Sequence, residues 1–278
     1  MPGFGAEVRG VDLARLSESI ASEVLDWFHR YSLLVFKDQA LAPAQELAVA
    51  RLFPHGDGPP NYHEFTVEGF PEIQKLGNLE ENGKPAAVLN KIGIEWHTDG
   101  TSRARPCVAT QLYAIAAPRT GGETLFASGY SAYEVLPAET RNRIRRLKVR
   151  YNYRNILDKI NAASGTVRST KDREGREWPD VVHPLVRLHP VTRREALWVT
   201  VSEMVTIDGM APSESAALVA ELQAPGLTSE LVYAHRYAPG DLVVWDNRCM
   251  FHSTTPYTFA GAQRLLHRIA LNGNEIPV

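Results

Sequence analysis

Apolar residues near the start of the chain recur with the periodicity of a helix, and short apolar runs come after them. In residues 16–31 they recur every three or four positions, and Ser17 supplies an N-cap, so this stretch predicts an amphipathic helix. The run Leu-Leu-Val-Phe at 33–36 predicts a buried strand. A second helix is predicted over 43–53, with proline in its first turn, and the Pro/Gly cluster at 54–60 predicts a loop.

The later pattern is dominated by short strands separated by turn signals. Strands are predicted at residues 73–76, 108–116, 124–126, 148–153, 185–188, 196–199, 241–245 and 264–271. Two more helices are predicted at 137–146 and 212–223. Many short strands with few helices are typical of a sandwich or barrel, so the expected fold class is mainly β with flanking helices.

One segment, 158–180, is largely polar and contains Ala-Ala-Ser-Gly at 162–165. Such a segment predicts a mobile loop or lid. The chain has no internal repeat and no low-complexity linker, so residues 1–278 are predicted to form a single domain.

The charge balance and cysteine content narrow the function classes. The 278 residues carry 30 Lys+Arg against 32 Asp+Glu, which excludes the strongly basic surface of a general nucleic-acid binder. The two cysteines form no C-x-x-C pair, and no apolar run approaches the roughly 18 residues of a membrane span. With no signal-peptide pattern at the start, we expect a cytoplasmic protein that binds neither nucleic acid nor membrane.

A His-x-Asp pair is the first candidate for chemistry. His97 and Asp99 lie two positions apart, so in extended chain their side chains share a face. An imidazole and a carboxylate make two thirds of the His-His-carboxylate set that binds iron(II). The pair alone is weak, and the best candidate for a third ligand is His252, which follows the predicted strand 241–245. Structural roles are expected for the histidines at 29, 183, 189, 235 and 267.

Two arginines on the last predicted strand leave two readings open. Arg264 and Arg268 share one face of that strand, and Leu265 and Ile269 share the other. Such a pair usually marks a solvated face. If the face instead lines a metal cavity, each arginine supplies a planar pair of N–H donors for a carboxylate or a sulfonate.

Several motifs in order resemble the iron(II)/2-oxoglutarate-dependent dioxygenases of the TauD/TfdA family. The motifs lie at residues 5–13, 33–39, 96–99, 118–125, 183–190, 245–248 and 264–268, and so run nearly end to end. The resemblance implies a double-stranded β-helix (jelly-roll, cupin-like) core. It also implies Fe(II), 2-oxoglutarate and O2 as cofactor and cosubstrates, and assembly as a homo-oligomer.

The resemblance also implies roles by position. The residues that match the iron ligands are His97, Asp99 and His252. Thr124 and Arg264 match residues that bind 2-oxoglutarate, and Arg268 matches the arginine that binds the anionic end of the substrate. The implied reaction hydroxylates a small carboxylate or sulfonate, or desaturates or cleaves it, and releases succinate and CO2.

Two departures from the taurine enzyme argue against taurine as the substrate. Gly93 stands where that enzyme has an asparagine, and His63 falls only near its expected sulfonate-binding histidine. Specificity is expected in the loops at 54–68, 82–94 and 158–180. Two alternatives keep the scaffold: a non-redox, metal-dependent cupin-like isomerase or hydrolase, and a non-catalytic binding protein.

Overall fold

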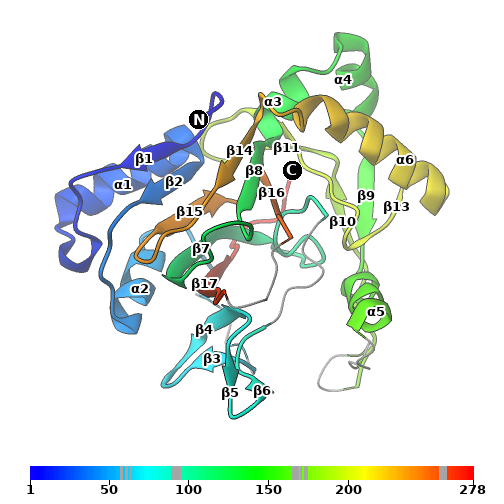
Figure 1. Ribbon diagram of the computed structural model, residues 1–278. Coiled ribbons are helices and arrows are strands. Elements are labelled where there is room, and N and C mark those ends of the chain that lie inside the picture. The colour runs from blue at the N-terminus through cyan, green and yellow to red at the C-terminus, as the bar shows by residue number, and fades with distance from the viewer. Residues whose placement is uncertain are drawn as a thin grey trace.

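The computed structural model describes residues 1–56, 59, 62, 64–88, 95–164, 169, 171, 175–256 and 262–278 (Figure 1). Its largest sheet has seven strands, which are, in spatial order, β1 (Ala6–Val8), β2 (Leu33–Phe36), β15 (Leu242–Asp246), β7 (Cys107–Ala116), β17 (Leu265–Asn272), β4 (Phe70–Gly77) and β3 (Thr66–Val67). Within it, β1 pairs with β2 in parallel and the other pairs are antiparallel.

A three-stranded sheet faces the large one. It consists of β14 (Val232–His235), β8 (Thr124–Ser128) and β16 (Met250–Thr254). Apolar side chains of both sheets, among them Leu112, Phe126 and Val243, form one buried cluster between them. Three smaller sheets complete the described strands. In one of them β9 (Lys148–Tyr151) lies between β10 (Val181–Pro184) and β13 (Met204–Ile207). The other two are the pairs β11 (Val186–Leu188) with β12 (Glu195–Leu197) and β5 (Glu80–Glu81) with β6 (Lys84–Pro85).

The run at β2 is apolar throughout because both faces of that strand are covered. Leu34 and Phe36 pack in a cluster with α1 (Glu18–Tyr31) and α2 (Pro43–Ala50), which lie against the large sheet (Figure 1). Leu33 and Val35 alternate with them and face the three-stranded sheet.

The remaining helices lie mostly at the far end of the molecule from α1. They are η1 (Leu13–Arg15), α3 (Gly129–Glu134), α4 (Ala138–Ile144), α5 (Tyr153–Ser164), α6 (Pro212–Gln223) and η2 (Ala224–Gly226). Side chains of α3, α4 and α6 form a third buried cluster with Phe251 of β16 and Ala127 of β8. Among the described residues, none of the helices is long and apolar enough to cross a membrane.

The fold class predicted from the pattern, mainly β with flanking helices, is confirmed. The loop predicted at 158–180 is wrong in its first part, because α5 continues to Ser164. Leu157 anchors this helix by burying its side chain, and Lys159 donates to the carbonyl of Val201 at 3.1 Å. Much of the rest of that segment lies outside the described residues, so the lid stays a prediction.

Several short strands were missed. The pattern predicted no strand at β13, β14 or β16, although β16 carries a candidate ligand, His252. In β16 the sequence Met-Phe-His-Ser-Thr has no simple alternation, yet four of its five residues are buried. Pairing with β8 makes this stretch a strand, and pairing between distant segments cannot be seen in local periodicity.

Candidate active site

Two backbone hydrogen bonds bring the first and third candidate ligands face to face. The N–H of His97 donates to the carbonyl of His252 at 2.9 Å, and the N–H of His252 donates to the carbonyl of His97 at 2.8 Å. The two imidazole centroids lie 4.0 Å apart. Residue 97 therefore has extended pairing, as predicted, while Asp99 lies where the chain enters a turn.

The three side chains form a set that fits a divalent transition metal. One ligand atom from each of His97, Asp99 and His252 lies within 4.8 Å of the others, and His252 Nε2 is 4.0 Å from Asp99 Oδ1. His97 Nδ1 lies 2.9 Å from the carbonyl oxygen of Glu95, so Nδ1 carries the proton and Nε2 keeps its lone pair. Two imidazoles and one carboxylate are the donors of the facial triad that binds Fe(II).

The charge states of His252 and Asp99 also suit metal binding. Burial and the neighbouring His97 hold the pKa of His252 well below its ordinary value, so this ring is neutral at neutral pH. Burial by itself would raise the pKa of Asp99, but the guanidinium of Arg268 and both imidazoles hold that pKa well below its ordinary value. His252 therefore presents a neutral nitrogen donor and Asp99 an ionised carboxylate.

A second cluster of similar composition does not fit a metal. It consists of His189, Asp246 and Cys249, all buried. His189 Nδ1 accepts from two backbone N–H groups at 3.2 and 3.1 Å, so its Nε2 carries the proton that is donated to Asp246 Oδ2. Both carboxylate oxygens of Asp246 also accept from Arg248, at 2.8 and 2.6 Å, which leaves the cluster satisfied without a cation.

Three more of the histidines expected to be structural, at 183, 235 and 267, have structural partners. His267 Nδ1 lies 2.9 Å from the buried carboxylate of Glu46. His235 Nε2 lies 3.1 Å from Asp241 Oδ2, and His183 Nε2 lies 2.9 Å from the carbonyl oxygen of Arg103.

Arg264 is buried beside Thr124 at one end of the site. It is 4% exposed, its Nε donates to the carbonyl of Gly122 at 3.2 Å, and its guanidinium carbon lies 5.9 Å from the ring centre of Tyr237. Gly121 and Gly122 both have a positive φ, near 75° and 73°, a backbone conformation that favours glycine and here aims the Gly122 carbonyl at the arginine.

A tyrosine that the sequence analysis did not single out completes this end. The hydroxyl oxygens of Thr124 and Tyr237 lie 3.0 Å apart. Burial raises the pKa of Tyr237 to about 12, so its hydroxyl stays protonated at neutral pH. Thr124, Tyr237 and Arg264 thus place two hydroxyls and a guanidinium together, a set of hydrogen-bond donors suited to a carboxylate.

Arg268 lies at the other end, against the carboxylate of the triad. Its Nη2 is 2.9 Å from Asp99 Oδ1, and its Nη1 donates to the hydroxyl of Tyr62 at 3.2 Å. The register of β17 against β4 places Arg268 directly opposite Gln74. These two side chains therefore share a face of the sheet, and both reach the same cavity.

The cavity that contains the triad lies between the two facing sheets. Its volume is about 240 Å³. The lining residues are Gln74, Leu76, Val88, His97, Asp99, Leu112, Thr124, Trp245, His252, Thr254, Arg264 and Arg268. All six residues singled out from the sequence are among them, so the two arginines lie on a cavity wall and not on a solvated face.

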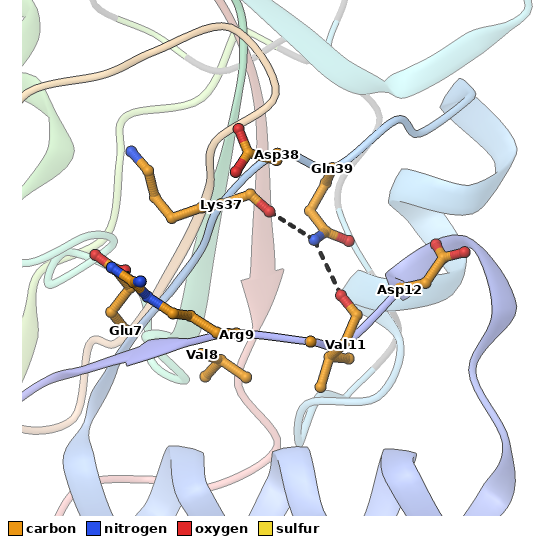
Figure 2. Close-up of a pocket in the computed structure, with 9 residues that line it drawn as sticks. Glu7, Val8, Arg9, Val11, Asp12, Lys37, Asp38 and Gln39 are labelled. Atoms are coloured by element: carbon orange, nitrogen blue, oxygen red, sulfur yellow. Dashed lines mark hydrogen bonds and ion pairs between the residues drawn. The ribbon is translucent and has the colours of Figure 1, made fainter.

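A larger hollow elsewhere holds no such chemistry. It measures about 610 Å³ and lies beside β1, between residues 7–12 and 37–39 (Figure 2). The amide of Gln39 donates to the carbonyls of Val11 and Lys37 at 3.0 and 2.8 Å and so ties the two segments together. None of the metal-binding clusters found among the described residues includes a group from this hollow.

The sequence analysis missed several residues that hold this site. Tyr62, Thr110 and Tyr237 were not singled out, since no motif or spacing in the local sequence marks them. Asn247 supports the turn before His252, because its backbone carbonyl accepts from Thr98 and Trp198, each at 2.8 Å. Gly93 and His63, named as departures, lie outside the described residues.

Comparison with known proteins agrees with this geometry. Residues 1–270 match the model of the taurine catabolism dioxygenase TauD, TfdA family. The chain is 32% identical to the (S)-phenoxypropionate/alpha-ketoglutarate-dioxygenase of Sphingobium herbicidovorans, over 96% of this chain and 92% of that protein. It is 28% identical to the alpha-ketoglutarate-dependent 2,4-dichlorophenoxyacetate dioxygenase of Cupriavidus pinatubonensis, over 98% and 96%.

Solved structures agree as well. The crystal structure of AAD-2 in complex with Mn(II) and N-oxalylglycine superposes with a TM-score of 0.82 at 29% identity, and the match covers 99% of this chain and 96% of that one. The family match spans nearly the whole chain, including every residue of the triad. The chain belongs to the taurine catabolism dioxygenase TauD, TfdA family.

Proposed function

We propose that this protein is an Fe(II)- and 2-oxoglutarate-dependent dioxygenase that oxidises a small molecule in which a carboxylate is attached to an apolar body. The observation that carries the proposal is the meeting of three groups in one cavity. These are the His97/Asp99/His252 triad, the Arg264 end and the Arg268 end.

In this proposal His97, Asp99 and His252 hold Fe(II). The bound iron supplies the oxidation, in which 2-oxoglutarate and O2 are consumed, succinate and CO2 are released, and a C–H bond of the substrate is oxidised. The protein itself holds the three ligand side chains in position. The bond from His97 Nδ1 to the Glu95 carbonyl orients one imidazole, and Trp245, whose ring centre lies 4.7 Å from that of His252, packs against the other.

Arg264 and Thr124 bind 2-oxoglutarate in this proposal. A buried guanidinium is a strong partner for a carboxylate, because it offers two parallel N–H donors in a site that water reaches poorly. The hydroxyls of Thr124 and Tyr237 are hydrogen-bonded to each other, so one of their two protons is left to donate beside it. These groups orient the cosubstrate toward the triad, so they act by positioning.

Arg268 receives the carboxylate of the substrate. A guanidinium has five N–H donors, and the bonds to Asp99 and Tyr62 account for two of them. Gln74, directly opposite, adds an amide at the same end of the cavity. The apolar body then contacts the side chains of Leu76, Val88 and Leu112 on the cavity wall.

The relatives support this class of substrate. Two of them are described as acting on phenoxypropionate and on 2,4-dichlorophenoxyacetate, which both join an aromatic ring to a carboxylate. No observation on the described residues favours the isomerase, hydrolase or binding-protein alternatives, none of which needs the Arg264 and Thr124 pair.

The test is a panel assay of the purified protein with Fe(II), 2-oxoglutarate and air. The panel contains (R)- and (S)-phenoxypropionate, phenoxyacetate, taurine and phenoxyacetamide, which is the neutral analogue of phenoxyacetate. Succinate formation and O2 uptake should rise with the carboxylates and not with the amide. Equal stimulation by the amide, or no stimulation by any carboxylate, would overturn the proposed substrate class.

A further inference from the structure

The carboxylate of Asp99 is held by a chain of hydrogen-bonded side chains that begins at its Oδ2 atom. Thr110, on β7, is fully buried, and its Oγ1 lies 2.5 Å from Asp99 Oδ2. Asn247 follows β15, and its Nδ2 lies 2.9 Å from the same Thr110 oxygen. Asn247 Oδ1 in turn lies 2.9 Å from Trp245 Nε1.

Counting protons fixes the direction of every bond in this chain. The indole Nε1 of Trp245 can only donate, so the atom of Asn247 that faces it must be the oxygen. The Asn247 nitrogen therefore faces Thr110 and can only donate, so the Thr110 hydroxyl accepts there. The single proton of that hydroxyl is left for Asp99 Oδ2.

A further bond ties the Asp99 backbone to the same amide. The N–H of Asp99 donates to Asn247 Oδ1 at 3.3 Å. The two oxygens of the carboxylate therefore have different surroundings. Oδ2 accepts from Thr110, whereas Oδ1 lies on the cavity side, 4.0 Å from His252 Nε2 and 2.9 Å from Arg268 Nη2.

We propose that Thr110, Asn247 and Trp245 are positioning residues that commit Asp99 Oδ2 to a hydrogen bond, so that Asp99 offers the iron a single oxygen, Oδ1. The inference rests on the proposed function, because it takes Asp99 as an iron ligand. With iron bound, two imidazoles and one carboxylate oxygen would leave the other positions of the ion open to the cosubstrates. A carboxylate that used both oxygens would take a fourth, which the cosubstrates would then lose.

The experiment replaces the Thr110 hydroxyl and measures metal binding without turnover. Thr110→Val removes the hydroxyl at nearly constant volume, and Thr110→Ser retains it. Thr200→Val is the matched control, because Thr200 is also fully buried but its hydroxyl lies 3.3 Å from that of Ser202, away from the triad. Co(II) binding is followed by titration calorimetry and by visible absorption, whose intensity and position report the number and geometry of ligands.

Thr110→Val should weaken Co(II) binding about 10- to 100-fold, the range found when a hydrogen bond to a metal ligand is removed, and should change the Co(II) spectrum. Thr110→Ser should restore both the affinity and the spectrum, and Thr200→Val should leave both as in the wild type. A purely structural role for Thr110 would lower the melting temperature of the metal-free protein and leave Co(II) affinity and spectrum unchanged, which would overturn the inference.

Two further outcomes separate this inference from the proposed function. If the wild type binds no Co(II), the proposed metal site itself fails, and the inference fails with it. If the wild type binds Co(II) and Thr110→Val binds it equally well with the same spectrum, the inference alone fails. Should Thr110→Val not fold, Trp245→Phe decides, since it removes the N–H that fixes the Asn247 amide. It should likewise weaken Co(II) binding, and unchanged binding would overturn the inference.

Discussion

Gly77 lies against the backbone of Arg264 with no room for a Cβ atom. A Cβ at this position would collide with the Arg264 carbonyl, and the φ of Gly77, 151°, is one that residues with side chains rarely adopt. The next residue continues the contact, because Asn78 N donates to the Arg264 carbonyl at 3.1 Å and Asn78 Oδ1 accepts from Arg264 N at 2.7 Å. The end of β4 thus fixes where the Arg264 side chain enters the cavity.

Gly77→Ala should therefore weaken 2-oxoglutarate binding indirectly, by changing the position of Arg264. We expect the KM for 2-oxoglutarate to rise about tenfold or more, because the start of β17 must shift to admit the methyl group. Gly69→Ala is the control, since Gly69 also has a positive φ but open space around it. If the two variants have the same KM for 2-oxoglutarate, the close contact at Gly77 does not position Arg264.

Arg264→Ala should lower the affinity for 2-oxoglutarate more directly. Loss of the buried, charge-assisted hydrogen bonds from this guanidinium is expected to cost about 2–3 kcal/mol of binding free energy. Arg264→Lys should recover part of this loss, because it keeps the charge but not the planar pair of donors. Calorimetric titration of the Co(II)-loaded protein under nitrogen measures both affinities. An affinity unaltered by Arg264→Ala would remove this residue from the cosubstrate site.

Arg268→Gln should act on the substrate and not on the cosubstrate. We expect the KM for phenoxyacetate to rise at least tenfold, while the KM for 2-oxoglutarate changes less than threefold. Initial rates of succinate formation give both constants. The assignment of Arg268 as the substrate's anion receptor fails if the two KM values change equally or if the phenoxyacetate KM does not change.

Asp246 should contribute stability that is lost in acid. Burial alone would raise the pKa of this carboxyl, but Arg248 and His189 hold it far below its ordinary value of 3.8. The folded protein therefore binds fewer protons than the unfolded chain at low pH, and its free energy of unfolding falls as the pH drops below about 4.

Asp246→Asn should remove that part of the acid sensitivity. At pH 7 it should cost about 3–5 kcal/mol of unfolding free energy, because Arg248 loses its buried partner. Urea unfolding at pH 7 and pH 2 measures both effects, with Asp26→Asn, an exposed position on α1, as the control. A cost at pH 2 as large as the cost at pH 7 would mean that Asp246 is not the acid-sensitive group.

The local pattern predicted those elements whose burial is regular. The strands at β2, β7 and β15 alternate between two covered faces or are apolar throughout, so their sequences identify them. The helix at α1 begins at its predicted cap, where the N–H of Ile20 donates to Ser17 Oγ at 3.3 Å. By contrast, β16 is a strand because of its partner β8, and its local sequence gives no such signal.

The residues of the candidate site were likewise predicted only in part. Residue type and spacing singled out His97, Asp99, His252 and the two arginines, and the family resemblance added Thr124. All six line the cavity. Thr110 and Tyr237 could not be found so, since a buried hydroxyl becomes meaningful only when the fold places it against Asp99 or Thr124. The contact of Arg268 with Asp99 is likewise a property of the assembled sheet.

The most direct test of the central claim is absorption spectroscopy under nitrogen. Addition of 2-oxoglutarate to the Fe(II)-loaded wild-type protein should produce a visible charge-transfer band. The band should be absent in His97→Ala, Asp99→Ala and His252→Ala, and retained in His29→Ala, which alters a histidine on α1 outside the cavity. A wild type without the band, or an Asp99→Ala variant that retains it at full intensity, would contradict the assignment of His97, Asp99 and His252 as the iron site.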